Sequence, residues 1–147
     1  MYRIGDGVCI DYKKAAKLYS QAAAQGNILA QYALGSCYMN GLGVQKDPLK
    51  AVEWFRKAAD NGDDCAQGDL GICYELGLGV QQSYVTAVFW YKKAAQQGNN
   101  PKAQSNLAEC YLMGKGVDQD LAQAKYWYNK AAAQGWETAK KMLKEYF

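Results

Sequence analysis

The residues of this 147-residue chain that could do chemistry are its five cysteines and a small group of acidic side chains. Cys37, Cys73 and Cys110 recur at intervals of about 36–37 residues. A disulfide bond needs Cα atoms within about 7 Å, and a zinc site needs ligands that converge on one point. Equivalent positions in stacked helical units lie about 10 Å apart or more. We therefore expect these three cysteines to be buried, unbonded thiols that pack as small apolar residues.

The other two cysteines, Cys9 and Cys65, have no counterparts in the remaining units. An odd number of cysteines without a Cys-x-x-Cys pair favours a reducing compartment. No apolar signal segment is visible in residues 1–20, and no apolar run approaches the about 20 residues of a membrane-spanning helix. These features favour a cytoplasmic location, although the sequence alone leaves the compartment open, and we expect no membrane insertion.

Catalytic patterns are missing from the sequence. The chain has no histidine, which excludes His-dependent triads and imidazole acid–base catalysis. Asp63, Asp64 and Asp69 fall in or just after a loop, where we expect solvated charges at a helix start and not a catalytic pair. No serine begins a Ser-x-x-Lys motif. The sequence thus predicts no catalytic residue, no metal site and no cofactor, and we expect the protein not to be an enzyme.

Four Gly-x-Gly-Val runs divide the chain into units of about 36–37 residues. The runs begin at Gly5, Gly41, Gly77 and Gly114. No strand pattern precedes them and no Gly-Lys-Ser/Thr follows, so we interpret them as turns and not as phosphate-binding loops. Their glycines allow positive φ angles, and each valine is expected to fill the junction between two helices.

Each unit reads as two helices. The first runs over residues 28–40, with an apolar stripe at helical spacing and a glycine at its end. The second begins with Asp47 as the N-cap and Pro48 at the first helical position. The equivalent caps in the other units are Asp11, Ser83 and Asp120, and the second helices end before Gly26, Gly62, Gly98 and Gly135. Large core fillers are expected in two adjacent columns: Leu18, Trp54, Trp90 and Trp127, then Tyr19, Phe55, Tyr91 and Tyr128.

The recurring pattern Ala-x-x-x-Leu-Gly-x-x-Tyr-x-x-Gly-x-Gly-Val, followed by Asp-x-x-x-Ala-x-x-Trp-Tyr-x-Lys-Ala-Ala-x-x-Gly, resembles the Sel-one-like repeat over nearly the whole chain. This family is a relative of the tetratricopeptide repeats. The resemblance implies an all-α fold, a right-handed α-solenoid of stacked antiparallel helix pairs with about four repeats. We expect a half repeat at the N-terminus, repeats over residues 28–62, 63–98 and 99–135, and a capping helix over 136–147.

The resemblance implies a scaffold or adaptor that binds a protein or peptide. The near-identical units with short, regular loops favour a bacterial source. Two alternatives stay open: a secreted penicillin-binding or β-lactamase-like repeat protein, and an immunity or host-factor-binding protein. The net charge of +3 is spread over both helix types, and no basic stripe with interleaved aromatics indicates nucleic-acid binding. The N-terminal edge, with Tyr2, Ile4, Leu18 and Tyr19, is expected to support self-association.

In the tetratricopeptide repeat the first helices line the concave wall. Aligning the Leu-Gly-x-x-Tyr segments implies a partner-binding set on the first helices of three units. This set is Tyr32, Ser36, Met39 and Asn40; Gly68, Ile72, Glu75 and Leu76; and Ser105, Glu109, Leu112 and Met113. Such a wall suits an extended peptide or a partner helix with basic and apolar side chains. The alternative is that Ile72 and Leu112 only fill gaps between neighbouring helices.

Overall fold

The computed structural model describes residues 11–147, and all regular structure within this range is α-helical. In chain order the helices are α1 (Tyr12–Ala24), α2 (Ile28–Asn40), α3 (Pro48–Asp60), α4 (Asp64–Leu76), α5 (Tyr84–Gln96), α6 (Pro101–Met113), α7 (Leu121–Ala133) and α8 (Glu137–Tyr146). Tyr2, Ile4, Cys9 and the first Gly-x-Gly-Val run lie outside the described residues. The expected helices over 28–40 and from Pro48 onward are confirmed.

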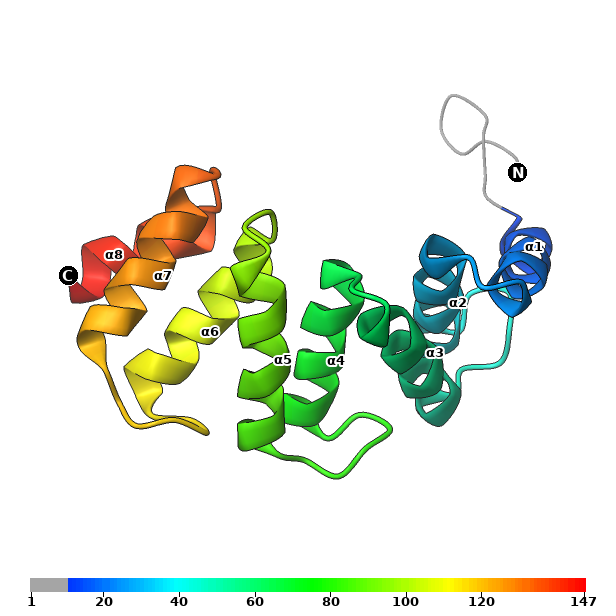
Figure 1. The fold of residues 1–147 in the computed structure, drawn as a ribbon, viewed down its shortest axis with the longest axis horizontal. Coiled ribbons are helices and arrows are strands. Elements are labelled where there is room, and N and C mark those ends of the chain that lie inside the picture. Colours follow the sequence, from blue (N-terminus) through cyan, green and yellow to red (C-terminus); the bar gives the residue numbers. More distant parts are fainter. Residues whose placement is uncertain (1–10) are drawn as a thin grey trace.

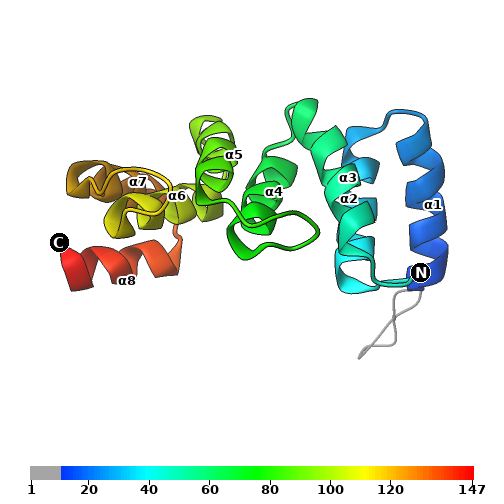
Figure 2. The ribbon, with the colours of Figure 1, turned by 90° about the horizontal axis from the view of Figure 1, so that it is seen from below.

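Each described helix packs against the helix that follows it in the chain. Figure 1 shows the helices as one curved row, with α1 and α8 at opposite ends. In Figure 2, α1 and α2 stand upright whereas α8 lies close to horizontal, so the helix pairs rotate along the row. This is the predicted right-handed α-solenoid. Within residues 11–147, no helix combines the length and apolar character that crossing a membrane requires.

Side-chain caps and glycines set the ends of the helices. The Asp47 carboxylate accepts a hydrogen bond from a backbone N–H in the first turn of α3. Pro48 follows at a position where its missing N–H breaks no hydrogen bond. Glycines mark the C-terminal ends of the first helices: α2 ends at Gly41, which has a φ of 66°. The other caps expected for the second helices, Asp11, Ser83 and Asp120, are confirmed.

The second glycine of each described Gly-x-Gly-Val run lies at a joint between units. Gly79 has a φ of 72°, and a Cβ atom there would overlap the backbone oxygen of Pro48 at the start of α3. Gly43 and Gly116 approach Tyr12 and Tyr84 in the same way. The run therefore does more than supply the predicted turn, since it also lets one unit stack closely on the preceding one.

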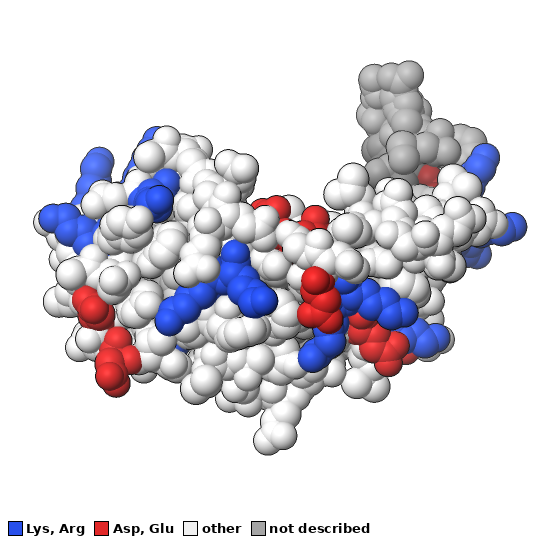
Figure 3. Space-filling model, in the orientation of Figure 1, with Lys and Arg blue, Asp and Glu red and all other residues white. Residues whose placement is uncertain are grey.

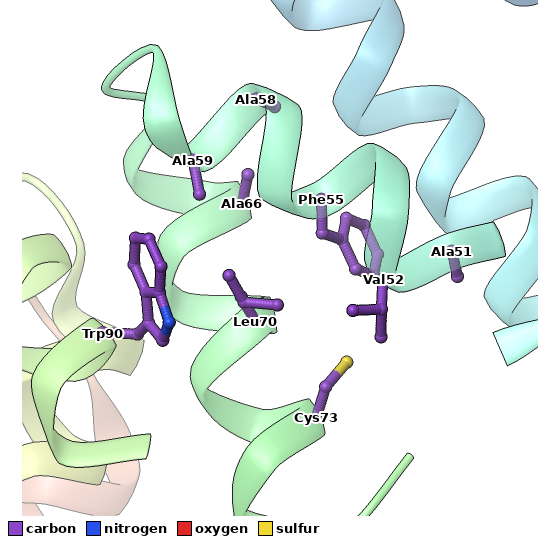
Figure 4. Close-up of a cluster of buried hydrophobic side chains, with 9 residues drawn as sticks. All are labelled: Ala51, Val52, Phe55, Ala58, Ala59, Ala66, Leu70, Cys73 and Trp90. Atoms are coloured by element: carbon purple, nitrogen blue, oxygen red, sulfur yellow. The ribbon is translucent and has the colours of Figure 1, made fainter. Parts of the chain in front are cut away.

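The core is a series of clusters along the row, one between each set of neighbouring helices. Figure 4 shows one of these clusters, which lies between α3, α4 and α5. In it, Leu70 and Cys73 of α4 face Val52 and Phe55 of α3. Trp90 enters this cluster from the next unit. Because each cluster uses residues from adjacent units, a single unit cannot bury its own apolar face.

The two columns of expected core fillers differ in burial. Phe55, Tyr91 and Tyr128 are at most 2% exposed, as predicted. The expectation is wrong for Leu18, which is 56% exposed, and Trp54 and Trp127 are only partly buried. The two columns differ in burial because the rings of Phe55 and Tyr91 point toward the first helix of their own unit. A Cβ atom on Gly71 would lie 2.6 Å from the Tyr91 ring, so glycine makes room for it.

The cysteine column is also confirmed. Cys37, Cys73 and Cys110 are buried and unbonded, and each lies within a helix that packs on its neighbours. Cys65 is unbonded as well, but it is exposed. The tyrosines that follow the column are partly buried, not fully buried.

Candidate functional site

Side chains from α2, α4 and α6 line two adjoining hollows, which we call the inner groove. Asp69, Ile72 and Lys102 border both hollows. The remaining lining includes Ser36, Met39 and Asn40 in one hollow and Tyr32, Cys65 and Asn106 in the other. Their volumes, about 120 and 210 Å³, are below the roughly 300 Å³ at which small-molecule pockets begin. The inner groove therefore suits individual side chains of a larger partner better than a small ligand.

Asp69 lies at the centre of the inner groove. Its carboxylate accepts a hydrogen bond of 2.8 Å from the Tyr32 hydroxyl, which joins α4 to α2. Burial raises the pKa of the Asp69 carboxyl, while the Tyr32 hydrogen bond and the charge of Lys102 act in the opposite direction. Burial, followed by the charge of Asp69, also raises the pKa of the Tyr32 hydroxyl. No ion pair within residues 11–147 involves Asp69, so its charge is only partly compensated.

The expectation that Asp69 is a solvated charge at a helix start is wrong. Asp63 is the N-cap of α4, and Asp64 lies in its first turn, but Asp69 is in the second turn and faces α2. Sequence reasoning could have singled it out by comparing units. Its repeat counterparts are Ala33 and Asn106, so the charge is not part of the fold's shared pattern. Lys102 is a second residue that was missed, with the counterparts Leu29 and Cys65.

The structure separates the twelve positions implied by the tetratricopeptide alignment into three groups. Asn40, Leu76 and Met113 are exposed. Tyr32, Ser36, Met39, Ile72, Glu75 and Glu109 are partly buried. Gly68, Ser105 and Leu112 are buried. Of these twelve, the inner groove takes in Tyr32, Ser36, Met39, Asn40, Gly68 and Ile72.

Ser105 and Leu112 were expected to face a partner, and their burial is a correction to that set. Ser105 is 5% exposed and Leu112 is 7% exposed. Leu112 packs in the cluster between α6, α7 and α8, so the gap-filling alternative describes it. Ile72 also touches the cluster around α5 and α6, but it borders both hollows as well. Leu112 is therefore covered by its neighbours, whereas Ile72 remains at the border of the inner groove.

The two glutamates of the expected set already have partners. The Glu75 carboxylate accepts a hydrogen bond of 2.8 Å from the hydroxyl of the buried Tyr91. A buried hydroxyl without a hydrogen-bond partner destabilises the folded state, so Glu75 stabilises the fold by accepting this bond. Glu109 lies 3.7 Å from the Lys115 ammonium group. Both ions of that pair are partly exposed, so their attraction contributes little to stability.

Comparison with known proteins places the chain among helical repeat proteins. The family model for the Sel1 repeat matches residues 1–27, 28–63, 66–99 and 101–136. A search of curated proteins found no match. Proteins built from Sel1 repeats are generally scaffolds for protein interactions, and the family is generally not enzymatic.

Three solved structures are similar over 90% of this chain. A protective antigen from uropathogenic Escherichia coli, described as having an SLR fold, is 40% identical with a TM-score of 0.87. A Sel1 repeat protein from Oxalobacter formigenes is 36% identical with a TM-score of 0.84. Cysteine rich protein B of Helicobacter pylori is 27% identical with a TM-score of 0.71, and the match covers 94% of it.

The chain spans 28% of the Escherichia coli antigen and 54% of the Oxalobacter formigenes protein. All three similar structures come from bacteria, which supports the expected bacterial origin. The repeat match extends over almost the entire sequence. This chain belongs to the Sel1 repeat family.

Proposed function

We propose that the protein is an interaction scaffold whose inner groove binds an extended segment of a partner protein through a basic side chain that pairs with Asp69. The observation that carries this proposal is the position of the Asp69 carboxylate. It borders both hollows and has a hydrogen bond from Tyr32 but no ion pair among residues 11–147. A lysine or arginine of the partner would supply the missing counter-charge in a site that is shielded from water.

The remainder of the inner groove has the mixture of side chains that peptide recognition uses. Met39 and Ile72 are partly buried apolar residues beside Asp69, and Met adapts readily to different partner shapes. Asn40 and Asn106 offer amide groups that can bond to a peptide backbone. Lys102, which also borders both hollows, would disfavour a second basic residue in the ligand. The expected ligand therefore has one basic residue flanked by apolar residues.

The test uses peptides selected from a random display library against the whole chain, with affinity measured by fluorescence polarisation. Asp69→Asn keeps an acceptor for the Tyr32 hydroxyl but removes the charge. We expect it to weaken binding of peptides with a basic residue by about tenfold or more, corresponding to the loss of one charge-assisted contact. Ile72→Ser should weaken the same peptides. The matched control is Leu29→Glu, which changes a 73% exposed residue outside both hollows.

Cys65 provides an independent readout because it is exposed and borders one hollow. In a Cys9→Ser background, an occupied inner groove should slow alkylation of Cys65 by a small maleimide. If the selected peptides bind Asp69→Asn and Ile72→Ser like wild type and leave Cys65 equally reactive, the inner groove is not the binding site.

A further inference from the structure

The outer surface of α5 and α7 carries large apolar side chains that the fold leaves in solvent. Val85 and Phe89 are one helical turn apart on α5 and are 69% and 51% exposed. On α7, Tyr126 at the position equivalent to Phe89 is 51% exposed. Trp127 links the two helices, since it packs against the buried cluster formed largely by α5. We call the surface formed by Val85, Phe89 and Tyr126 the outer stripe.

The repeat architecture does not require aromatic residues on the outer stripe. Phe89 and Tyr126 occupy equivalent positions in their units, and the same position is Lys17 in α1 and Glu53 in α3. Lys17 and Glu53 are both exposed. A helix of this fold therefore accepts a charged residue at this position. The exposed rings at equivalent positions of two successive units need another reason, and exposed apolar surface that the fold does not require is typical of an interaction site.

The two rings are held in a similar way. Phe89 packs edge-to-face on Trp90 with ring centroids 5.2 Å apart, and Tyr126 packs on Trp127 at 5.1 Å. A lysine lies near each ring, Lys93 at 5.2 Å from the Phe89 centroid and Lys130 at 5.3 Å from the Tyr126 centroid. Both rings are thus fixed in place before any partner arrives, which lowers the entropic cost of binding.

The charged residues within α5 and α7 are all positive, although the N-cap of α7 is Asp120. Helices α5 and α7 contain Lys92, Lys93, Lys125 and Lys130, and neither helix contains an acidic residue. In Figure 3 basic atoms gather over α5 near the centre of the view. The inner groove differs, because its central charge is Asp69. The net charge was expected to be spread over both helix types, whereas the charged residues of these two second helices are all basic.

We propose that the outer stripe is a second docking surface, which binds an acidic amphipathic helix of a partner protein. Apolar residues of that helix would cover Phe89 and Tyr126, and its carboxylates would pair with Lys93 and Lys130. Aliphatic Val85 extends the apolar surface beside Phe89, which favours a protein helix over a nucleic-acid strand, since a strand would use the rings alone. The stripe shares no residue with the inner groove, so the protein would connect a basic segment on one surface with an acidic helix on another.

The test is a selection from a random-peptide display library on the whole chain, followed by binding to two variants. Phe89→Glu gives α5 the residue type that α3 has at the equivalent position, and Tyr126→Lys gives α7 the residue type that α1 has there. Because the fold already accepts both charges at this position, we expect both variants to melt like wild type. Selected peptides that combine acidic and apolar residues should bind either variant at least about tenfold more weakly. They should bind Leu29→Glu and Asp69→Asn like wild type.

Three results would overturn this proposal. The first is the absence of acidic peptides among the selected sequences. The second is unchanged binding of such peptides to Phe89→Glu and Tyr126→Lys. The third is binding of phosphatidylserine vesicles or single-stranded oligothymidine that is lost in both variants, since it would assign the outer stripe to a membrane surface or a nucleic acid.

Discussion

The side-chain amide of Gln97 donates a hydrogen bond of 2.8 Å to Oε1 of Gln67, joining the end of α5 to the first turn of α4. Gln67 in turn donates from Nε2 to the backbone oxygen of Ala59 at the end of α3. The next unit repeats the arrangement, with Gln134 donating to Gln104 at 2.7 Å. Buried glutamines therefore connect three successive helices, and each one is satisfied by its neighbours.

The first unit lacks this contact. Asn61 occupies the position of Gln97 and Gln134, but its shorter side chain donates to the backbone oxygen of Lys57. Oε1 of the buried Gln31 consequently accepts no hydrogen bond from the part of the chain that the structure describes. Asn61→Gln should supply the donor and stabilise the protein by about 1 kcal/mol. This would raise Tm by about 2–4 °C in thermal melting.

A Gln31→Leu background is the control, because it removes the acceptor. Asn61→Gln should then give no increase in Tm. An equal increase in both backgrounds would show that the effect comes from helix propensity or solvation and not from the expected hydrogen bond.

Gly79→Ala tests the joint between units. The new Cβ atom would overlap the Pro48 backbone oxygen at a φ of 72°, so the second unit would have to move away from the first. Gly98→Ala is the matched control, because Gly98 has a φ of 87° but no atom within 4 Å of an added Cβ. The control should cost about 1 kcal/mol of unfolding free energy, and Gly79→Ala at least about 2 kcal/mol more. Urea denaturation measures both, and equal losses would contradict the role of Gly79 in stacking.

Thiol alkylation should separate the cysteines by burial. Burial raises the pKa of the Cys73 thiol to about 11 and, with the charge of Glu75, that of the Cys110 thiol to about 12. Only the thiolate reacts, so these buried thiols should stay unmodified at pH 8 while the exposed Cys65 is labelled. Mass mapping of the folded chain measures this. A disulfide between any two of the buried column cysteines would contradict the stacking.

Cys65 should itself react more slowly than a free cysteine. Burial and then the negative charge of Asp64 raise the pKa of its thiol, which lowers the thiolate fraction near neutral pH. Asp64→Asn should therefore speed alkylation at pH 8, and the difference should shrink at a pH where both thiols are ionised. A rate that Asp64→Asn leaves unchanged at every pH would exclude this charge effect.

Asp69 gives a pH dependence of stability with a defined sign. Its pKa is raised in the folded state, mainly by burial, so the folded chain holds this proton more tightly than the unfolded chain. The resulting loss of stability is absent below the ordinary value of 3.8 and develops as pH rises through the raised folded-state value. Asp69→Asn should therefore melt at a higher temperature than wild type at pH 7, with the gain vanishing in acid. Parallel Tm curves for the two proteins would contradict the raised pKa.

Leu18 on α1 tests the expected self-association. It is 56% exposed and borders a largely apolar hollow together with Ala15 and Tyr19. We expect concentration-dependent dimers in sedimentation velocity, and Leu18→Asp should shift them to monomers without lowering Tm. A wild-type chain that remains monomeric at high concentration would remove the support for this contact.

Most of the fold could be predicted because it depends on local chemistry that recurs. Asp47 as a cap, Pro48 at the first helical position and Gly41 at a helix end each act within a few residues, and repetition across units removes the ambiguity of any single one. The regular spacing of Cys37, Cys73 and Cys110 already indicated stacked positions that are too far apart for a disulfide bond.

The candidate sites depend on which residues meet across units, and periodicity alone does not determine this. Leu112 stands in one column with Met39 and Glu75, yet only Leu112 is buried. It packs in a cluster with residues of α7 and α8, whereas Met39 borders the inner groove. Asp69 was assigned to solvent because its partner, Tyr32, lies on another helix. The sequence by itself thus determined the helices and their order of stacking. The tertiary structure decided which side chains are left for a partner, since burial is set by neighbours that are distant in the chain.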